Sequence, residues 1–448
     1  MNNIVSTHSK SIDFLLENAG PVIRYRLRRD ILQDLTPGEE ESLLEQIYRL
    51  HPFVLLQSYV KPDGYIGSGM HSWDNWRGQV LHETPLQDGE SAARLLSYYC
   101  IPKRHPVVAG FVAAMRDEEI LRKEFSYIPP EIPRFEKRFV GLNNGNCLQA
   151  LLYTMQAMLG YGDDFEDLAD FQQICLKGFA RVAQARSLEE LTKYDAGAKR
   201  KYNYPYIEAE DYFPDAYTLA MLAYTKSWRG GREEAVTQGD GTGSAPGKGK
   251  GAPAMQGDGT GSAPGKGKGA PAMPGDGTGS APGKGQGVRA MRGEEPGPAP
   301  GETPVSMLAR ALNHINAVMR PDNEMHVRIC GKYVAPCFAM IRPIRAFRSD
   351  LIDTVTYRRV LSEIAMLGVG QQADVIRESV ANVEEALDGD GVLRMDFSAP
   401  HNKRYSPRRI EYPSPYGDVR LEADYGQKNA FLCDLTFWAL EFLWLAET

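Results

Sequence analysis

The chain has 448 residues, of which 42% are hydrophobic and 24% charged, and its formal net charge at pH 7 is -7. It contains no apolar run long enough to cross a bilayer, and no basic start followed by an apolar stretch, as in a signal peptide. An acidic balance argues against nucleic acid as the main partner. We therefore expect a soluble cytoplasmic protein with no transmembrane segment and no nucleic acid partner.

Apolar residues that recur three and four positions apart predict helices along most of the chain. In chain order, the predicted helices cover residues 9–19, 21–35, 39–50, 90–100, 105–121, 145–159, 165–185, 214–228, 305–319, 354–368, 373–388 and 428–446. Pro37 and Pro214 are typical of helix starts, and Gly160 and Gly368 of helix ends. Alternation typical of strands is confined to short pieces such as 392–395. The sequence predicts an all-α protein.

Residues 237–303 differ from the rest of the chain because they are rich in Gly, Pro and Lys and contain no aromatic residue. A repeat of 18 residues starts at Gly239 and recurs, with changes, at Gly257 and Gly275. Such a segment buries too little apolar surface to offset the entropy lost on ordering. We expect a disordered low-complexity insert within a single domain, either a tolerated expansion or a tether for a partner.

The loops between the predicted helices distinguish weakly between an α-solenoid and a closed ring of helical hairpins. Those at 61–78, 81–91, 193–215 and 388–418 are long and rich in Gly, Asp and aromatic residues. A solenoid usually repeats short, similar loops, whereas long loops at one end of a helical barrel commonly form a pocket. The loops favour the ring.

Three segments resemble the repeats of the squalene-cyclase and prenyltransferase superfamily. The first is Gln57 followed by Asp63-Gly64-Tyr65-Ile66-Gly67, a helix end, a tight turn and an aromatic residue. The second is residues 141–164, in which Gly145-Asn146 starts a helix that ends in Leu-Gly-Tyr-Gly-Asp-Asp. The third is Asp388-Gly389-Asp390-Gly391-Val392-Leu393.

Further segments resemble uncharacterised bacterial proteins related to this superfamily. They are Pro21 to Arg26, Tyr212 to Pro214 and Thr225 to Arg229. The resemblance covers about 20–230 and 305–445 and implies an α/α toroid, with helical hairpins in inner and outer rings. Residues 1–236 and 304–448 would then be the two parts of one toroid. The Asp-x-Asp-Asp acid motif of squalene cyclases is absent from the sequence, and the zinc ligands of protein prenyltransferases cannot be placed at their motifs.

The densest polar cluster lies in the loop at 61–78 and just beyond it. His71, Asp74 and His82 are candidate catalytic residues, because His exchanges protons near neutral pH and a carboxylate can orient it. Trp73 and Trp76 are candidate ligand-binding residues, whose ring faces stack on sugars or stabilise cations. The alternative is a loop fixed by Trp packing, with solvated charges.

A second cluster combines the candidate catalytic carboxylates Glu208 and Asp211 with Tyr206, a candidate binding residue. Paired carboxylates in different environments can divide acid and base roles. The alternative is an exposed acidic loop before a helix, where negative charge is favourable. Asn143 and Asn146 are candidate ligand-binding amides, but Asn also caps helices.

Six cysteines occur, at 100, 147, 175, 330, 337 and 433, and no pair has CxxC spacing. We expect buried reduced thiols, and no spacing indicates a metal site. The sequence identifies neither a cofactor nor an oligomeric state.

Three functional hypotheses follow. The first is a protein that binds or processes an isoprenoid-like, small-molecule or lipid-like ligand in an apolar, aromatic-lined cavity with one protonatable carboxylate or a metal. The second is a glycan-active helical-barrel enzyme with a polar groove, stacked Trp and paired carboxylates. The third is a non-catalytic binding or scaffold protein whose cavity is filled by side chains.

Overall fold

A computed structural model describes most of the chain. The described residues are 3–67, 88–124, 148–194, 205–208, 211, 213–229, 301–321, 323, 325–329, 332–334, 340–350, 359–395, 420–424 and 426–448. The chain divides into two units, one formed by Met1–Ala235 with Glu295–Thr448 and the other by Val236–Glu294. Every described residue belongs to the first unit. The predicted insert at 237–303 lies outside the described residues, except for its last three positions.

The described chain is mostly helical, as the sequence predicts. The α-helices are α1 (Asn3–Thr7), α2 (Ser9–Asn18), α3 (Pro21–Arg26), α4 (Pro37–Tyr48), α5 (His51–Ser58), α6 (Gly89–Tyr98), α7 (Pro106–Met115), α8 (Glu118–Glu124), α10 (Leu148–Gln156), α11 (Glu166–Gln184), α12 (Ala216–Ala223), α13 (Pro304–Val318), α14 (Ser362–Met366), α15 (Asp374–Ala386) and α16 (Ala430–Glu447). Two π-helices, η1 (Leu27–Leu32) and η2 (Ala157–Tyr161), continue α3 and α10 without a break. Short 3₁₀ turns are η3 (Leu188–Glu190) and η7 (Gly370–Gln372).

A small three-stranded sheet is the feature that the sequence pattern did not predict. β1 (Tyr206–Glu208) pairs in parallel with β2 (His326–Ile329), and β2 pairs antiparallel with β3 (Lys332–Val334). The strands are three or four residues long, too short for an alternating pattern to be recognised. The strand-like piece at 392–395 forms only an isolated bridge, between Leu387 and Leu393.

The helix ends follow the chemistry of their capping residues. Thr36 and Glu39 form a reciprocal capping box ahead of α4, with Pro37 in the first turn, as the sequence indicates. Asp215, rather than Pro214, caps α12, and its carboxylate accepts hydrogen bonds from the N–H groups of Tyr217 and Thr218. Gly160 lies inside η2, one residue before its end, and its φ of 83°, a left-handed conformation that favours glycine, breaks the helical geometry there.

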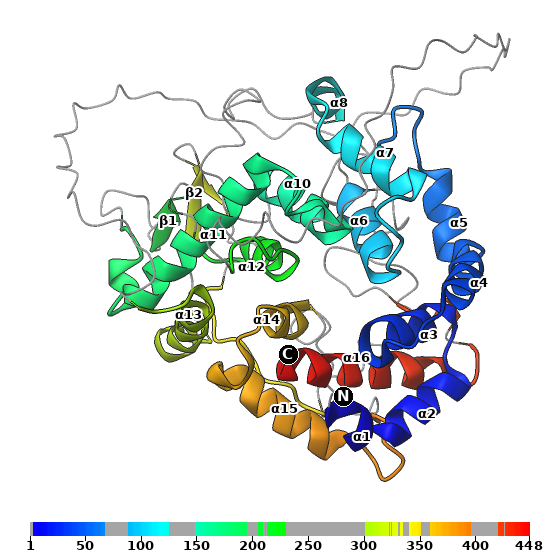
Figure 1. Cartoon of the computed structure of the whole chain (residues 1–448). Coiled ribbons are helices and arrows are strands. Elements are labelled where there is room, and N and C mark those ends of the chain that lie inside the picture. Colours follow the sequence, from blue (N-terminus) through cyan, green and yellow to red (C-terminus); the bar gives the residue numbers. More distant parts are fainter. Residues whose placement is uncertain are drawn as a thin grey trace, which may run out of the picture. The chain divides into compact units, whose positions relative to one another are not determined.

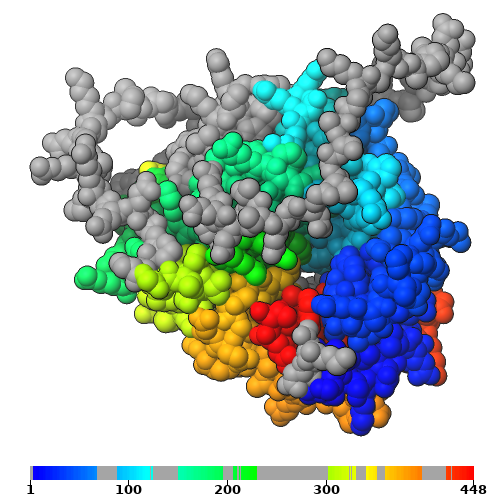
Figure 2. Space-filling view, viewed as in Figure 1, coloured from blue at the N-terminus to red at the C-terminus, as the bar shows by residue number. Residues whose placement is uncertain are grey.

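Helices that follow one another in the sequence pack in pairs. α3 contacts α4, α5 contacts α6, α11 contacts α12 and α13, and α15 contacts α16. A second series of contacts links one helix of each pair to a helix of the next pair. These contacts join α6 with α10, α10 with α12, α12 with α14, α14 with α16, and α16 with α3 (Figure 1). The N-terminal helices therefore lie against the C-terminal helix, as the adjoining blue and red atoms in Figure 2 show.

The hydrophobic core is continuous through these contacts. α16 has apolar residues on nearly all sides, and most of its side chains are buried, including Phe437, Trp438 and Phe442. The last helix is thus apolar nearly all round and lies in the core. A helix buried on all sides must contact several others, and α16 contacts α2, α3, α14 and α15.

Two turns far apart in the sequence share one backbone arrangement. After α5, Lys61 donates to the carbonyl of Tyr65, and Gly64 donates to the carbonyl of Lys61. After α15, residues 388–392 repeat both hydrogen bonds at the equivalent positions, at 3.1 and 2.8 Å. Gly64 and Gly391 have φ values of 86° and 73°, and each turn is closed by an isolated antiparallel bridge. The two turns belong to the first and third of the similar sequence segments.

Candidate functional site

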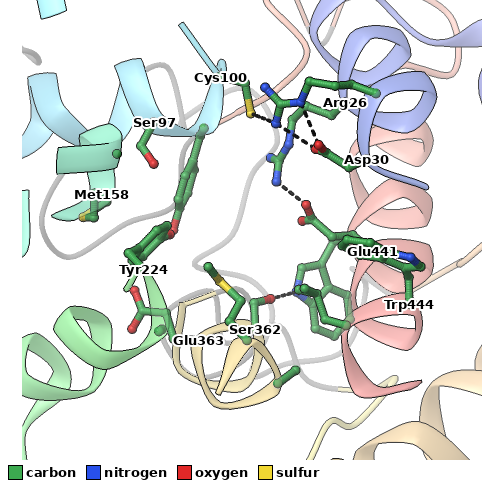
Figure 3. A pocket seen from close by; sticks show the side chains of 18 of the residues that line it. Arg26, Asp30, Ser97, Cys100, Met158, Tyr224, Ser362, Glu363, Glu441 and Trp444 are labelled. Carbon is green, nitrogen blue, oxygen red and sulfur yellow. Dashed lines mark hydrogen bonds and ion pairs between the residues drawn. The ribbon is translucent and has the colours of Figure 1, made fainter. Parts of the chain in front are cut away.

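A cavity of about 680 Å³ lies where several helices end. α6, η2, α12 and α14 reach it with their last turns, and the segment formed by α3 and η1 and the helix α16 pass along it. Small-molecule sites commonly enclose about 300–1,000 Å³. The cavity is therefore large enough for a small ligand, and most of its lining residues lie on helices, with short connecting segments between them (Figure 3).

Glycines and π-helical turns shape this wall. The π-helices η1 and η2 both contribute lining residues, among them Arg29 and Leu159. π-Helical turns are rare and occur frequently at functional sites, because they shift the side chains that follow. Gly368, which lies two residues after the end of α14, also lines the cavity and has a left-handed φ of 73°.

Glu363 on α14 is the most unusual group in the wall. Its side chain is 1% exposed, and neither carboxylate oxygen has a hydrogen-bond partner among the described residues. Burial raises its pKa to about 7 from an ordinary value of 4.5, and the opposing charges of Arg359 and Arg94 only partly offset this effect. Glu363 is therefore poised to hold or release a proton near neutral pH.

Two tyrosines lie on the same side of the cavity. Tyr98 at the end of α6 and Tyr224 after α12 both line it, and Figure 3 shows the carboxylate of Glu363 beside Tyr224. Burial, followed by the proximity of Tyr98 and Glu363, raises the pKa of Tyr224 well above its ordinary value. Tyr224 thus remains a neutral hydroxyl group that can donate or accept a hydrogen bond.

A buried network lies behind Glu363. Arg94 donates from Nε and Nη2 to one oxygen of Glu90, at 3.1 and 3.0 Å, and Tyr217 donates to the other at 3.1 Å. Arg359 approaches Glu90 at 3.5 Å. Burial of these groups removes them from water, and a buried charge is tolerated only when it is paired. The network fixes the helices α6 and α12 and the segment before α14 around Glu363.

The opposite wall carries a separate set of ion pairs (Figure 3). Arg26 forms an ion pair with Glu441 on α16, and Arg29 pairs with Asp30 at 2.7 Å. Arg29 also donates to the sulfur of Cys100 at 3.0 Å. Burial raises the pKa of the Cys100 thiol despite the neighbouring arginines, so the thiol is protonated at neutral pH. The cavity therefore has one carboxyl without a partner and, on its other side, carboxylates held by arginines.

The residues predicted from the second sequence cluster come together, but not at the cavity. Glu208 on β1 pairs with Arg328 and approaches Lys193 at 3.7 Å. Asp211 pairs with Arg181 at 3.3 Å and with Lys193 at 3.7 Å. The guanidinium of Arg328 lies 4.4 Å from the ring centroid of Tyr206. None of the three predicted residues, Tyr206, Glu208 and Asp211, lines the cavity. Glu208 therefore pairs with β2 and Asp211 with α11, and Lys193 lies close to both carboxylates.

The other predicted site residues lie outside the described residues. They are His71, Trp73, Asp74, Trp76, His82, Asn143 and Asn146. Their roles as catalytic or ligand-binding groups stay predictions.

Sequence reasoning missed Glu363, although a signal was present. Glu363 interrupts the apolar face of the predicted helix at 354–368, between Leu361 and Ile364, which are both fully buried. A charged residue at an apolar position is rarely buried without a purpose. The pair Glu90 and Arg94 gave no such signal. Oppositely charged residues four positions apart also form ion pairs on exposed helix faces, so the sequence does not show that this pair is buried.

The second similar segment contributes to the cavity rim. Asp163 accepts hydrogen bonds from the N–H groups of Lys226 and Ser227, at 3.0 and 3.1 Å, and so fixes the chain that follows α12. Asp164 forms an ion pair with Lys103, a lining residue. The paired aspartates of this segment are therefore structural groups that position the rim.

Comparisons of the chain with protein-family models, with curated proteins and with solved structures gave no match. No helix in the described ranges combines the length and apolar character needed to cross a membrane. Within the same ranges, no group of three or more His, Cys, Asp or Glu side chains is arranged to hold a metal ion.

Proposed function

We propose that the chain is an α/α toroid of the squalene-cyclase and prenyltransferase kind that binds an isoprenoid-like small molecule in its central cavity. Glu363 then transfers a proton to or from the ligand. A cytoplasmic location is part of this proposal, and the free thiols of Cys100 and Cys433 are consistent with a reducing compartment.

The order of helix contacts supports the toroid. The segment of α3 and η1, the turn η2 that continues α10, and the helices α6, α12, α14 and α16 meet at the cavity, and contacts link most neighbours in this series. The helices between them in the sequence, among them α4, α7, α11, α13 and α15, do not contribute lining residues. This alternation is what inner and outer rings of helical hairpins require.

The two equivalent turns support the relationship to that superfamily. The similar segments at Asp63-Gly64 and Asp390-Gly391 adopt the same hydrogen bonds and the same left-handed glycine. Both follow helices, α5 and α15, that precede helices lining the cavity. A sequence repeat that recurs with one backbone geometry at equivalent places in the helix order favours a true structural repeat.

One observation supports the function most strongly, namely a protonatable carboxyl without a partner in an aromatic-lined cavity. Tyr98, Tyr224, Phe437 and Trp438 line the cavity together with Glu363. Aromatic and aliphatic walls suit an apolar ligand body. With a pKa of about 7, Glu363 is about half protonated at neutral pH, so it can act either as an acid or as a base.

A titration with a short isoprenoid alcohol, geraniol, tests this proposal. We expect saturable binding to the purified chain by calorimetry. Ser97 is a small residue that lines the cavity, and the large side chain in S97W should fill it. We expect the affinity to fall at least about tenfold, which corresponds to roughly 1.4 kcal/mol of binding free energy. The matched control is V54W, because Val54 on α5 is exposed and does not line the cavity. Equal binding by both variants would contradict the proposal.

A glycan-active enzyme is the second candidate, and Glu441 favours it. Glu441 lines the same cavity as Glu363 but is paired with Arg26, so the two carboxyl groups have unlike environments. Such a pair can divide acid and base roles in glycoside hydrolysis. Cellobiose that binds in competition with geraniol, and more tightly than it, would favour this candidate.

A further inference from the structure

The buried groups around Glu363 do not balance in charge. Glu90, Asp215 and Glu363 are carboxylic acids, and Arg94 and Arg359 are the guanidinium groups among them. The pKa of Asp215 is raised by burial to about 6, so this residue is mostly ionised at neutral pH. When all three carboxyl groups are ionised, these five described residues together carry a net charge of -1, from three carboxylates and two guanidinium groups. We call these five residues the buried charge cluster.

Only Glu363 connects this unmatched charge to the cavity. Glu90 accepts hydrogen bonds from Arg94 and Tyr217, and Asp215 accepts them from the N–H groups that start α12. Glu363 alone among the three carboxyl groups lines the cavity. Its two oxygens have no hydrogen-bond partner in the described chain. A proton on Glu363, or a cation inside the cavity, would neutralise the net charge of these five residues at the one carboxyl group among them that lines the cavity.

We propose that the ligand carries a protonated amine that binds to the carboxylate of Glu363 and completes the buried charge cluster. This inference rests on the proposed function for the apolar body of the ligand and adds its polar end. The ammonium group donates up to three hydrogen bonds, enough to satisfy the carboxylate oxygens of Glu363.

The surrounding wall favours a cation at this position. Tyr224 lies beside Glu363 and Tyr98 lines the same cavity, and aromatic ring faces attract ammonium groups. The last turns of α6, η2, α12 and α14 all reach the cavity, and a helix C-terminus carries a partial negative charge. These contributions act in the same direction as the carboxylate.

The basic residues that line the cavity do not cancel this effect. Arg26 and Arg29 are paired with Glu441 and Asp30 on the opposite wall. Lys103 is paired with Asp164 at the rim. Arg229, also exposed at the rim, donates to the carbonyl of Met366.

The remaining basic lining residue, Lys226, has an exposed side chain at the rim. The charged groups that act on Glu363 are Arg359, Arg94 and Glu90, not the lining arginines and lysines.

Binding should exchange a proton for the ligand cation. The ionisable groups that face Glu363 are Glu90, Arg94 and Tyr98 on α6, Asp215 and Tyr224 at the two ends of α12, Arg359 before α14, and Asp434 on α16. Burial raises the pKa of Glu363 itself to about 7, so its carboxyl group can exchange a proton near neutral pH. The ammonium group stabilises the ionised carboxylate, so Glu363 releases about half a proton to solvent at pH 7.

A matched set of probes tests this inference. Geranylamine, geraniol and geranic acid share one isoprenoid chain and differ only in the polar end. We expect geranylamine to bind roughly tenfold more tightly than geraniol, and geranic acid more weakly than both. In E363Q this preference for the amine should be lost, because the amide carries no charge. Calorimetry in buffers of different ionisation enthalpy should detect proton release with geranylamine in the original chain and none in E363Q.

The outcomes separate the two proposals. Binding of geraniol without any preference for geranylamine, or a preference that persists in E363Q, overturns the inference and leaves the proposed function standing. Failure of all three probes overturns the proposed function. Far-ultraviolet circular dichroism and thermal unfolding of E363Q verify that the variant folds. If it does not, E363D keeps the charge but withdraws it from the ligand, and should reduce the amine preference without abolishing proton release.

Discussion

Arg94 donates both Nε and Nη2 to a single oxygen of Glu90, one helical turn earlier in α6, and both side chains are inaccessible to solvent, with exposed fractions of 2% and 0%. The same oxygen faces Arg359 from a segment far away in the sequence. This carboxylate therefore holds two guanidinium groups inside the protein. An ion pair in this position cannot exchange its partners for water, so removal of one member leaves the others buried and uncompensated.

The first prediction concerns this pair. Replacing Glu90 in E90A should lower the free energy of unfolding by about 3–5 kcal/mol, because Arg94 and Arg359 lose their shared counter-charge. The matched control is E45A on α4, whose partner Arg49 is also four residues away, but whose side chain is 58% exposed. E45A should cost less than about 1 kcal/mol. Urea unfolding followed by circular dichroism measures both values, and equal losses would contradict the argument.

The second prediction concerns the pH dependence of stability. The pKa of Glu363 is raised from 4.5 to about 7 in the folded chain, so the folded state binds more protons than the unfolded state between these values. Stability contributed by this group is fully present below about pH 4.5 and is lost as pH rises through 7. Since one pKa unit corresponds to about 1.4 kcal/mol, the loss amounts to roughly 3 kcal/mol.

E363Q should remove this dependence. At pH 8 the variant should be more stable than the original chain by roughly 3 kcal/mol, and near pH 4.5 the difference should vanish. Burial also raises the pKa of Glu422 to about 7, but Glu422 is present in both proteins and cancels in the comparison. Unfolding free energies measured from pH 4.5 to 8 test this. A difference that stays constant across the range would show that Glu363 does not titrate as described.

Much of the helical fold could be predicted from sequence because apolar spacing and caps act locally. Thr36 and Glu39 form the capping box that starts α4, and Gly160 marks the break in helical geometry near the end of η2. The strands around Tyr206 could not be predicted, because they are short and their pairing with 326–329 depends on distant contacts. Glu363 interrupts the apolar face of its predicted helix, but this local signal does not show whether the carboxylate finds a partner. Its significance arises only when α6, α12 and α14 meet.

The predicted site residues illustrate the same limit. The sequence predicts Glu208 and Asp211 as site residues because these acidic residues lie beside tyrosines. In the structure both carboxylates lie close to Lys193. Sequence spacing could not show that Arg328 and Arg181 would neutralise them. Whether a charged group is paired depends on residues far away in the sequence. A site that requires an unpaired group can therefore be recognised only from the three-dimensional structure.

The last prediction concerns the turn after α5. Gly64 has a φ of 86°, and a Cβ atom added to it would lie 2.8 Å from the carbonyl oxygen of Gly110 in α7. G64A therefore meets both a strained backbone and a backbone clash that no side-chain rotation relieves. We expect a loss of at least about 2 kcal/mol of unfolding free energy.

The matched control is G38A in the first turn of α4, where no atom lies within 4 Å of the added Cβ. Alanine is the better helix former, so G38A should be neutral or should stabilise by up to about 1 kcal/mol. Thermal and urea unfolding of both variants decide the point: a G64A protein as stable as the original would mean that the close approach of Gly64 and Gly110 is not required, and would remove one structural reason for the repeated Asp-Gly turn.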